Sequence, residues 1–335
     1  MKKILVSLVF AAFFVIAAIT LRCGTVTAAE TVTLKAISAW PKTAVEYKAW
    51  VIWADILDQM VAKKAPGELK VQLLGGPEVV KGPDQVPALQ RGQVDIVYTS
   101  GAYYTNVLPE IDALKLSSYT PAEERANGAM AYLNDLHQKK LGGVYYLGRL
   151  GLDAKFFVYL KKPVKSADFT GLNIRVSPLY LQAIKGLGGN PVVMPLGDTY
   201  LALERNVVDG ACSPGVGLRE WGWQKQLKYV VEPGFYRIPN PFLVNLNAWN
   251  KLPQKLKDIM RDATIEGEKK VVAEMEELAK KERPALIAEG IQVIDLPPAE
   301  KEKFLRIAYD EGWKDVIQKN PQTGPELRKL LSKSK

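Results

Sequence analysis

Histidine and cysteine are scarce in this sequence. Its 335 residues include one histidine, His137, and two cysteines, Cys23 and Cys212. A zinc site made of imidazole and thiolate ligands needs more of these residues, and a catalytic serine triad would have to use His137. The sequence also contains no Gly-x-Ser-x-Gly elbow, phosphate-binding loop or dinucleotide-binding glycine motif. We therefore expect no catalytic residues, no metal site and no cofactor.

The residues that catalysis most often uses have ordinary structural explanations here. His137 lies beside lysines on a predicted helix, which favours an exposed position. Cys212 has no histidine near it in the sequence to lower its pKa, so we expect a small buried side chain rather than a nucleophile. Glu123 and Glu124 are expected to be solvated on an exposed helix face. A secreted hydrolase acting through Cys212 is the alternative from the enzyme class.

The N-terminus has the pattern of a secretory signal. Two lysines follow Met1, an apolar run covers residues 4–21, and small residues end at Ala29. A basic start, an apolar region and a small-residue cleavage site occur in this order in cleavable signals. We predict a signal peptide over residues 1–29, cut after Ala28 or Ala29, and a periplasmic location. An uncleaved anchor over residues 4–21 is the alternative, because about 18 apolar residues are the lower limit for spanning a bilayer.

Cleavage at this site would leave a mildly basic chain without a disulfide. It removes Lys2, Lys3 and Arg22, so the formal charge falls from +9 to +6, and Cys212 becomes the only cysteine. About 300 residues can be stabilised by core burial alone. The charge attracts anions slightly, but no basic block precedes the C-terminal tail, so we expect no nucleic-acid partner. We expect a solvated tail, whose basic residues are Arg328, Lys329, Lys333 and Lys335.

Strand-like and helix-like periodicities alternate along the chain, which predicts α/β layers. The predicted strands cover residues 31–36, 69–73, 94–98, 144–147, 156–160, 172–176, 192–194, 207–211 and 291–294. The predicted helices cover residues 44–64, 84–91, 121–140, 178–186, 198–206, 253–289 and 299–318. Thr120, Pro121 and Glu123 form a start signal for the third helix. Pro284 is expected to kink or end the long helix because it lacks a backbone N–H.

Arg175 lies within an apolar predicted strand. Strand parity places Leu172, Ile174 and Val176 on one face, and Asn173 and Arg175 on the other. A buried arginine needs a partner because an unpaired buried charge is costly. The partner could be a carboxylate of the protein itself. It could also be a ligand carboxylate, which a guanidinium binds through two parallel hydrogen bonds.

Aromatic residues gather near the ends of predicted strands, where α/β proteins collect their ligands. Core or interface packing is the alternative role for each of them. Those that could line a ligand cleft are Trp40, Tyr103, Tyr104, Trp221 and Trp223, and the others are Tyr98, Phe235 and Tyr236.

Several blocks of sequence resemble a known family. Residues 169–176 read Phe-Thr-Gly-Leu-Asn-Ile-Arg-Val, and residues 187–195 read Leu-Gly-Gly-Asn-Pro-Val-Val-Met-Pro. Residues 198–210 read Asp-Thr-Tyr-Leu-Ala-Leu-Glu-Arg-Asn-Val-Val-Asp-Gly, and another block covers residues 89–96. Together, from about Val32 to about Gly290, the chain resembles the solute receptors of TRAP (tripartite ATP-independent periplasmic) transporters, of the C4-dicarboxylate-receptor type.

The resemblance implies an α/β fold of the two-domain, periplasmic-binding-protein type. Such a fold has a cleft between its domains and a long domain-spanning helix, and it closes on a ligand by hinge motion. Residues 30–152 plus 241–280 would form domain I. Residues 153–240 plus 281–335 would form domain II, and the helix predicted over residues 253–289 would span the two.

The resemblance also assigns site residues, with some departures from the family. Arg175 matches the arginine that binds the ligand carboxylate. Lys155 stands at the position of a second family arginine, and Arg149 lies near enough to substitute. Ser213 stands where the family often has an asparagine. Because lysine lacks the bidentate fork and serine makes fewer hydrogen bonds than an amide, these departures favour an aromatic or other bulky monocarboxylate over a C4-dicarboxylate.

The sequence thus predicts an exported, monomeric receptor that is not an enzyme. It would capture a small organic carboxylate and deliver it to the membrane permease subunits of a TRAP transporter. A receptor for an ATP-driven importer is the alternative from the binding class.

Overall fold

The computed structural model describes residues 31–151 and 154–333. The predicted signal peptide and Lys335 lie outside the described residues. Within the described ranges, no helix has both the length and the apolar character needed to cross a membrane.

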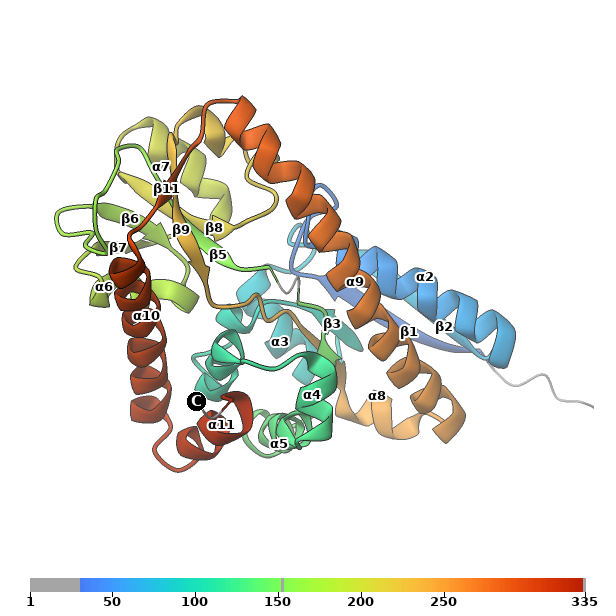
Figure 1. The fold of residues 1–335 in the computed structure, drawn as a ribbon. Coiled ribbons are helices and arrows are strands. Elements are labelled where there is room, and N and C mark those ends of the chain that lie inside the picture. The colour runs from blue at the N-terminus through green and yellow to red at the C-terminus, as the bar shows by residue number, and fades with distance from the viewer. Residues whose placement is uncertain (1–30, 152–153, 334–335) are drawn as a thin grey trace, which may run out of the picture. The chain divides into compact units, whose positions relative to one another are not determined.

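Five strands form the first sheet, in the order β2-β1-β3-β10-β4 (Figure 1). They are β1 (Val32–Ser38), β2 (Leu69–Gly75), β3 (Ile96–Tyr98), β4 (Val144–Arg149) and β10 (Pro241–Asn245). β1 pairs in parallel with β2 and β3, whereas β10 pairs antiparallel with β3 and β4. The chain therefore returns to the first sheet after it has formed most of the second.

Six strands form the second sheet, in the order β11-β9-β5-β8-β6-β7. They are β5 (Phe156–Leu160), β6 (Asn173–Val176), β7 (Asn190–Val193), β8 (Gly210–Pro214), β9 (Tyr229–Phe235) and β11 (Gln292–Asp295). β6 lies between β7 and β8 and pairs in parallel with both. β5 pairs antiparallel with β8 and β9. β6, which carries Arg175, is thus an inner strand of a mixed sheet.

Ten α-helices surround the sheets in the described chain. They are α2 (Tyr47–Lys64), α3 (Gly82–Gln90), α4 (Pro121–Ala126), α5 (Ala129–Leu136), α6 (Leu181–Gly186), α7 (Thr199–Glu204), α8 (Leu246–Lys251), α9 (Gln254–Ala288), α10 (Pro298–Lys319) and α11 (Gly324–Leu331). The 3₁₀ segments η2 (Gly101–Tyr103) and η3 (Pro109–Leu116) follow β3. The long helix α9 packs along α2 and also contacts β4 (Figure 1).

Most predicted elements are confirmed, including the long helix over residues 253–289, but the helix predicted over residues 121–140 is divided in the structure. The capping box at Thr120 is present, yet α4 ends at Ala126, and α5 begins after Gly128, whose φ of +89° breaks the predicted helix. Pro284 does not end α9, which continues to Ala288. β9 and β10 were not predicted.

The C-terminal tail is not simply solvated, because it contains α11. Leu327 and Leu331 are fully buried, and the carbonyl of Leu331 accepts a hydrogen bond from the backbone of Ser118 at 2.8 Å. Arg328 and Lys329 are exposed, as expected. The prediction missed this helix because basic residues on its outer face hid a short apolar stripe.

The α/β class is confirmed, whereas the exact domain boundaries stay a prediction. The strands of each sheet come from the segments predicted for one domain. However, residues Val32–Lys335 form one unit of contacts, and α11 packs against α5 and η3, which belong to predicted domain I.

Candidate ligand-binding site

The predicted site residues Arg175 and Ser213 lie on one face of the second sheet, together with Phe157. Arg175 on β6 pairs with Ala211 on β8, and Ser213 lies two positions further along β8. Ser213 in turn pairs with Phe157 on β5. Because paired residues share a face and side chains alternate along a strand, Arg175, Ser213 and Phe157 face the same side.

The Arg175 guanidinium is buried among neutral groups. The residue is 2% exposed. Its Nε and Nη2 atoms donate to the carbonyl of Met194 at 3.3 and 2.9 Å. Its Nη1 atom lies 3.2 Å from the hydroxyl of Tyr180 and 3.4 Å from the carbonyl of Cys212. No carboxylate of residues 31–151 or 154–333 pairs with it, so the alternative of a protein carboxylate partner is not met in that part of the chain.

Two aromatic residues accompany this guanidinium. The Trp223 ring lies 5.8 Å from the Arg175 guanidinium carbon, and its buried Nε1 atom has no partner in the described chain. The Tyr103 hydroxyl comes from η2, beyond the first sheet. Burial and the charge of Glu46 raise the pKa of Tyr103, whereas Arg175 lowers it. Tyr103 is therefore within electrostatic reach of Arg175 although the two residues are far apart in the chain.

Lys155 and Ser213 flank the same face. Lys155 directly precedes β5; its side chain is exposed and makes no ion pair with a described residue. Its backbone carbonyl accepts from Gly215 at 3.1 Å, which holds this position beside the end of β8. Ser213 is 2% exposed. The structure thus places an exposed cation beside the end of β8 and a buried hydroxyl on the Arg175 face of the sheet.

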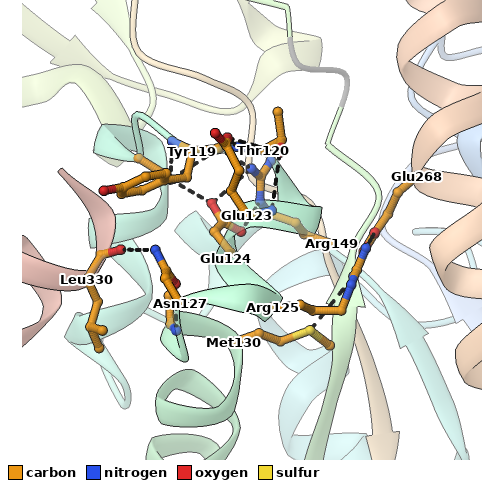
Figure 2. Close-up of polar contacts among 12 residues, drawn as sticks. Tyr119, Thr120, Glu123, Glu124, Arg125, Asn127, Met130, Arg149, Glu268 and Leu330 are labelled. Carbon is orange, nitrogen blue, oxygen red and sulfur yellow. Dashed lines mark hydrogen bonds and ion pairs between the residues drawn. The ribbon is translucent and has the colours of Figure 1, made fainter. Parts of the chain in front are cut away.

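Arg149 already has a carboxylate partner within the protein. It is 2% exposed, and its Nε and Nη2 atoms donate to the two carboxylate oxygens of Glu124 at 2.8 and 2.9 Å (Figure 2). Ser117 donates to the same carboxylate at 2.6 Å. The expectation that Glu124 is exposed was therefore wrong. A ligand could use Arg149 only by leaving Glu124 buried and unpaired, which is costly.

The remaining predicted aromatics are buried or half-buried. Trp40 is 8% exposed, with its ring centroid 4.8 Å from that of Tyr98, and half-buried Trp221 packs against buried apolar side chains. Tyr104 is buried elsewhere: its hydroxyl lies 3.0 Å from the Nε2 atom of His137. Tyr104 thus packs in the core beside α5, away from Arg175.

The expected exposed position of His137 was wrong. Its ring is fully buried, and Nδ1 lies 2.7 Å from the carbonyl of Leu133. Burial lowers the pKa of His137 to about 4. The lysines that suggested exposure follow it in a π-helical turn, which rotates them away from the ring.

Sequence reasoning missed three contributors to the site. Tyr180 follows Arg175 closely and its hydroxyl also donates to the carbonyl of Cys212 at 3.3 Å. Met194 contributes its backbone carbonyl, which accepts from Arg175, and a backbone contact cannot be predicted from the residue type. Glu46 acts on Tyr103 from the start of α2. Only Tyr180 had a sequence signal, because a tyrosine just after the Arg175 strand lies at a strand end.

Cys212 is the buried thiol that was expected. It is fully buried, and burial raises the pKa of its thiol. Among residues 31–151 and 154–333, no group of three histidine, cysteine, aspartate or glutamate side chains is placed to hold a metal ion.

A two-sheet α/β fold with a buried, charge-unpaired arginine on an inner strand suits an extracytoplasmic solute receptor, and comparison with known proteins shows this class. A profile described as bacterial extracellular solute-binding protein, family 7, matches residues 38–320. The chain belongs to this family, whose members are the solute-binding proteins of TRAP transporters.

Individual relatives agree with this assignment. The chain is 28% identical to a monocarboxylate 2-oxoacid-binding periplasmic protein of Nostoc sp. strain PCC 7120, over 82% of this chain and 76% of that protein. A TRAP solute-binding protein of Bordetella bronchiseptica, with calcium and picolinate bound, has a TM-score of 0.76 at 22% identity and covers 90% of this chain and 92% of its own. A Bordetella pertussis extracytoplasmic receptor that binds pyroglutamic acid has a TM-score of 0.76 at 17% identity, covering 90% and 100%. The fold is therefore the two-domain α/β fold of these receptors, with a long helix.

Proposed function

We propose that this receptor captures a small organic carboxylate and that Arg175 binds the carboxylate group. The observation that carries the proposal is the buried guanidinium of Arg175, which has only neutral partners in the described chain. Its neutral acceptors hold the side chain in place but do not balance its charge. An incoming carboxylate supplies the missing negative charge and accepts charge-assisted hydrogen bonds.

Lys155, Ser213, Trp40, Tyr103, Trp221 and Trp223 complete the proposed site. Lys155 contributes a second positive charge, and Ser213 a hydroxyl on the Arg175 face. The aromatic rings surround the body of the ligand. Arg149 and Tyr104 support the fold instead, because Glu124 and His137 hold their polar groups.

A monocarboxylate with an apolar or aromatic body suits this set of side chains. One buried guanidinium serves one carboxylate, and the rings favour apolar surface. The ligands of similar proteins support this choice, since one has picolinate bound, an aromatic monocarboxylate, and another is named for monocarboxylate 2-oxoacids.

The proposed mechanism is capture followed by delivery. An open cleft admits the acid, Arg175 pairs with it, and domain closure excludes water, which strengthens the ion pair. The closed receptor then docks on the membrane permease subunits and releases the acid. Export by cleavage after Ala28 or Ala29 and a monomeric state belong to the same proposal. Sequencing of the mature N-terminus and light scattering test them.

Substitution of Arg175 tests the proposed site. Hydrogen bonds to charged groups contribute about 1.5–3 kcal/mol each, so Arg175→Ala should weaken carboxylate binding about a hundredfold or more. The acid found by a thermal-shift screen of aromatic and aliphatic acids would be titrated by calorimetry. Arg205→Ala, which removes an exposed arginine, is the matched control and should bind normally. Wild-type affinity in a folded Arg175→Ala protein would contradict the assignment.

We also propose that the receptor has no enzymatic activity. Cys212, the nucleophile of the hydrolase alternative, is buried with a raised pKa, and its carbonyl serves Arg175. Turnover of any ester or amide that is lost in Cys212→Ser would overturn this. The neighbouring genes distinguish a TRAP transporter from an ATP-driven importer. Genes for a pair of integral membrane subunits, without a gene for an ATPase, would support the TRAP transporter.

A further inference from the structure

A groove between α10 and α11 contains none of the proposed ligand-binding residues. The two helices contact each other and form the C-terminal end of the described chain, drawn in red in Figure 1. The groove has a volume of about 950 Å³, and Leu116 at the end of η3 contributes to its lining. It is therefore a concave surface distinct from the proposed site for the acid.

One wall of the groove is an apolar ridge on α10. Leu305, Tyr309, Trp313 and Ile317 line the groove at intervals of four residues, which places them along one face of the helix. Leu305, Tyr309 and Ile317 are only half-buried, whereas Phe304 on the neighbouring stripe is fully buried. The ridge is thus apolar surface that the fold leaves partly uncovered, as is typical of interaction sites.

The length of the ridge indicates what it can bind. From Leu305 to Ile317 it extends for about 18 Å, at about 1.5 Å per residue. A small acid would contact only one end of it, and a flat lipid surface would not enter a groove. A helix of a partner protein can lie along the whole ridge, because helices bind apolar grooves through side chains three and four residues apart.

The charged residues around the ridge differ between the two walls of the groove. Those of the α11 wall are all basic, and they are Arg328, Lys329 and Lys333. Those of the α10 wall are mixed, with Arg306 about one helical turn from both Glu302 and Asp310. The α11 wall is therefore the side with a uniform positive charge.

The positive charge of the α11 wall is only partly balanced within the protein. Lys333 pairs with Glu123 at 2.9 Å. Lys329 lies 3.5 Å from Glu326, but both side chains are exposed, so this pair contributes little. Arg328 forms no ion pair with a described residue. Acidic side chains of a partner would be attracted to this wall, since complementary charges favour the correct partner and orientation.

We propose that the groove between α10 and α11 is a docking site for the membrane permease. The permease would place an amphipathic helix in it, with apolar side chains on the α10 ridge and acidic side chains opposite Arg328 and Lys329. This inference rests on the proposed function, because the permease subunits are the partner proposed there. It identifies a surface through which the receptor is held while it delivers the acid.

Reversal of charge on the α11 wall tests the electrostatic part. The probe is the pair of permease subunits in phosphatidylcholine nanodiscs, and surface plasmon resonance measures their affinity for the acid-loaded mature receptor. Arg328→Glu/Lys329→Glu should weaken docking about tenfold or more, because like charges would then face each other. Wild-type docking should weaken as the salt concentration rises, and docking of the variant should depend less on salt.

The matched control changes the same charge elsewhere. Lys269→Glu/Lys270→Glu reverses two adjacent exposed lysines of α9, and Lys269 has a similar glutamate neighbour, Glu266, at 3.6 Å. This control should dock with wild-type affinity. Equal affinities of the wild type and of Arg328→Glu/Lys329→Glu would overturn the proposed docking site.

Leu305→Gln tests the apolar ridge and should also weaken docking about tenfold, because a polar side chain replaces apolar contact area. Its control, Leu201→Gln, changes a leucine of α7 that is 50% exposed and should dock normally. Circular dichroism and calorimetric binding of the acid establish that each variant is folded and active as a receptor. Normal docking of a folded Leu305→Gln protein would contradict the role of the ridge.

Other occupants of the groove give different results. Binding of the wild type to empty nanodiscs that contain phosphatidylglycerol, as tight as to the permease, would show a lipid surface instead. A wild-type dimer in sedimentation that Arg328→Glu/Lys329→Glu dissociates would show a second copy of the chain. Either result, or no docking of the acid-loaded wild type, overturns this inference. Failure of the wild type to bind any acid in calorimetry overturns the proposed function itself.

Discussion

At the residue scale, two buried arginines and the half-buried Arg125 distinguish structural from functional charges. Arg149 is paired with Glu124, and Arg125 with Glu268 (Figure 2). Arg175 has only carbonyl and hydroxyl partners. Breaking a buried ion pair costs about 3–5 kcal/mol, which explains why the paired arginines belong to the fold. A buried arginine that is held in place but not neutralised is prepared for an anionic ligand.

The burial of His137 should make the stability of the protein depend on pH. Its pKa in the folded protein is about 4, below the ordinary value of 6.5. Between these pH values, His137 binds a proton in the unfolded chain but not in the folded protein. The free energy of unfolding therefore falls as the pH drops from about 7 to 4. The full effect is about 3 kcal/mol, at about 1.4 kcal/mol per pKa unit.

Urea unfolding of the wild type and of His137→Gln, measured from pH 7.5 to 4.5, checks this. Other groups titrate in both proteins, so the difference between them isolates His137. The variant should lose less stability on acidification, and parallel pH profiles would show that His137 is not the group responsible.

At the element scale, α9 and α11 show how packing overrides local signals. Pro284 cannot donate a backbone hydrogen bond, yet α9 continues to Ala288, and Leu286 beyond it is buried. In α11, the buried Leu327 and Leu331 hold a short helix against α5 and η3. The side chain of Asn127 donates to the carbonyl of Leu330 at 2.9 Å and fixes its end (Figure 2).

Leu331→Ala should destabilise the protein although it lies near the chain terminus. Large-to-small changes of a fully buried leucine cost about 2–5 kcal/mol. Lys329→Ala, two positions away on the exposed face, should change stability by less than about 0.5 kcal/mol. Chemical unfolding of the two variants compares them directly. Equal, small effects would mean that α11 is dispensable for the fold.

At the scale of the whole molecule, the chain passes between the two sheets more than once. β10 returns to the first sheet after β9, and β11 rejoins the second sheet after α9. Multiple crossings would hold the two predicted domains together during the hinge closure of the proposed mechanism. Tyr103 belongs to predicted domain I and Arg175 to predicted domain II. A ligand that contacts both should therefore stabilise the molecule as a unit.

Ligand binding should raise the melting temperature cooperatively. A ligand at a hundred times its dissociation constant adds about 2.7 kcal/mol to the free energy of unfolding, which corresponds to several degrees. Picolinate and 2-pyridinemethanol have the same ring, but only the first has a carboxylate, so only the first should shift the transition. The Arg175→Ala protein should respond to neither. A shift by the alcohol alone would contradict carboxylate recognition.

The sequence predicted much of the fold and part of the site. Periodicity located nine strands and the long helix, because burial patterns are local. β9 and β10 were missed because Tyr229–Phe235 and Pro241–Asn245 lie in a stretch rich in proline and glycine. Arg175 was predicted, because an arginine in an apolar strand is visible in the sequence. Glu46 was not, because nothing in its neighbourhood along the chain shows that it is buried.

The sequence by itself determined the α/β class, the export signal pattern and the identity of Arg175 as the residue to examine. These depend on residue types and on their spacing along the chain. Only the tertiary structure decided which charges are neutralised within the protein, since Glu124 of α4 forms an ion pair with Arg149 of β4 while no described carboxylate pairs with Arg175. Burial and charge pairing depend on distances in space, and residues far apart in the chain set them.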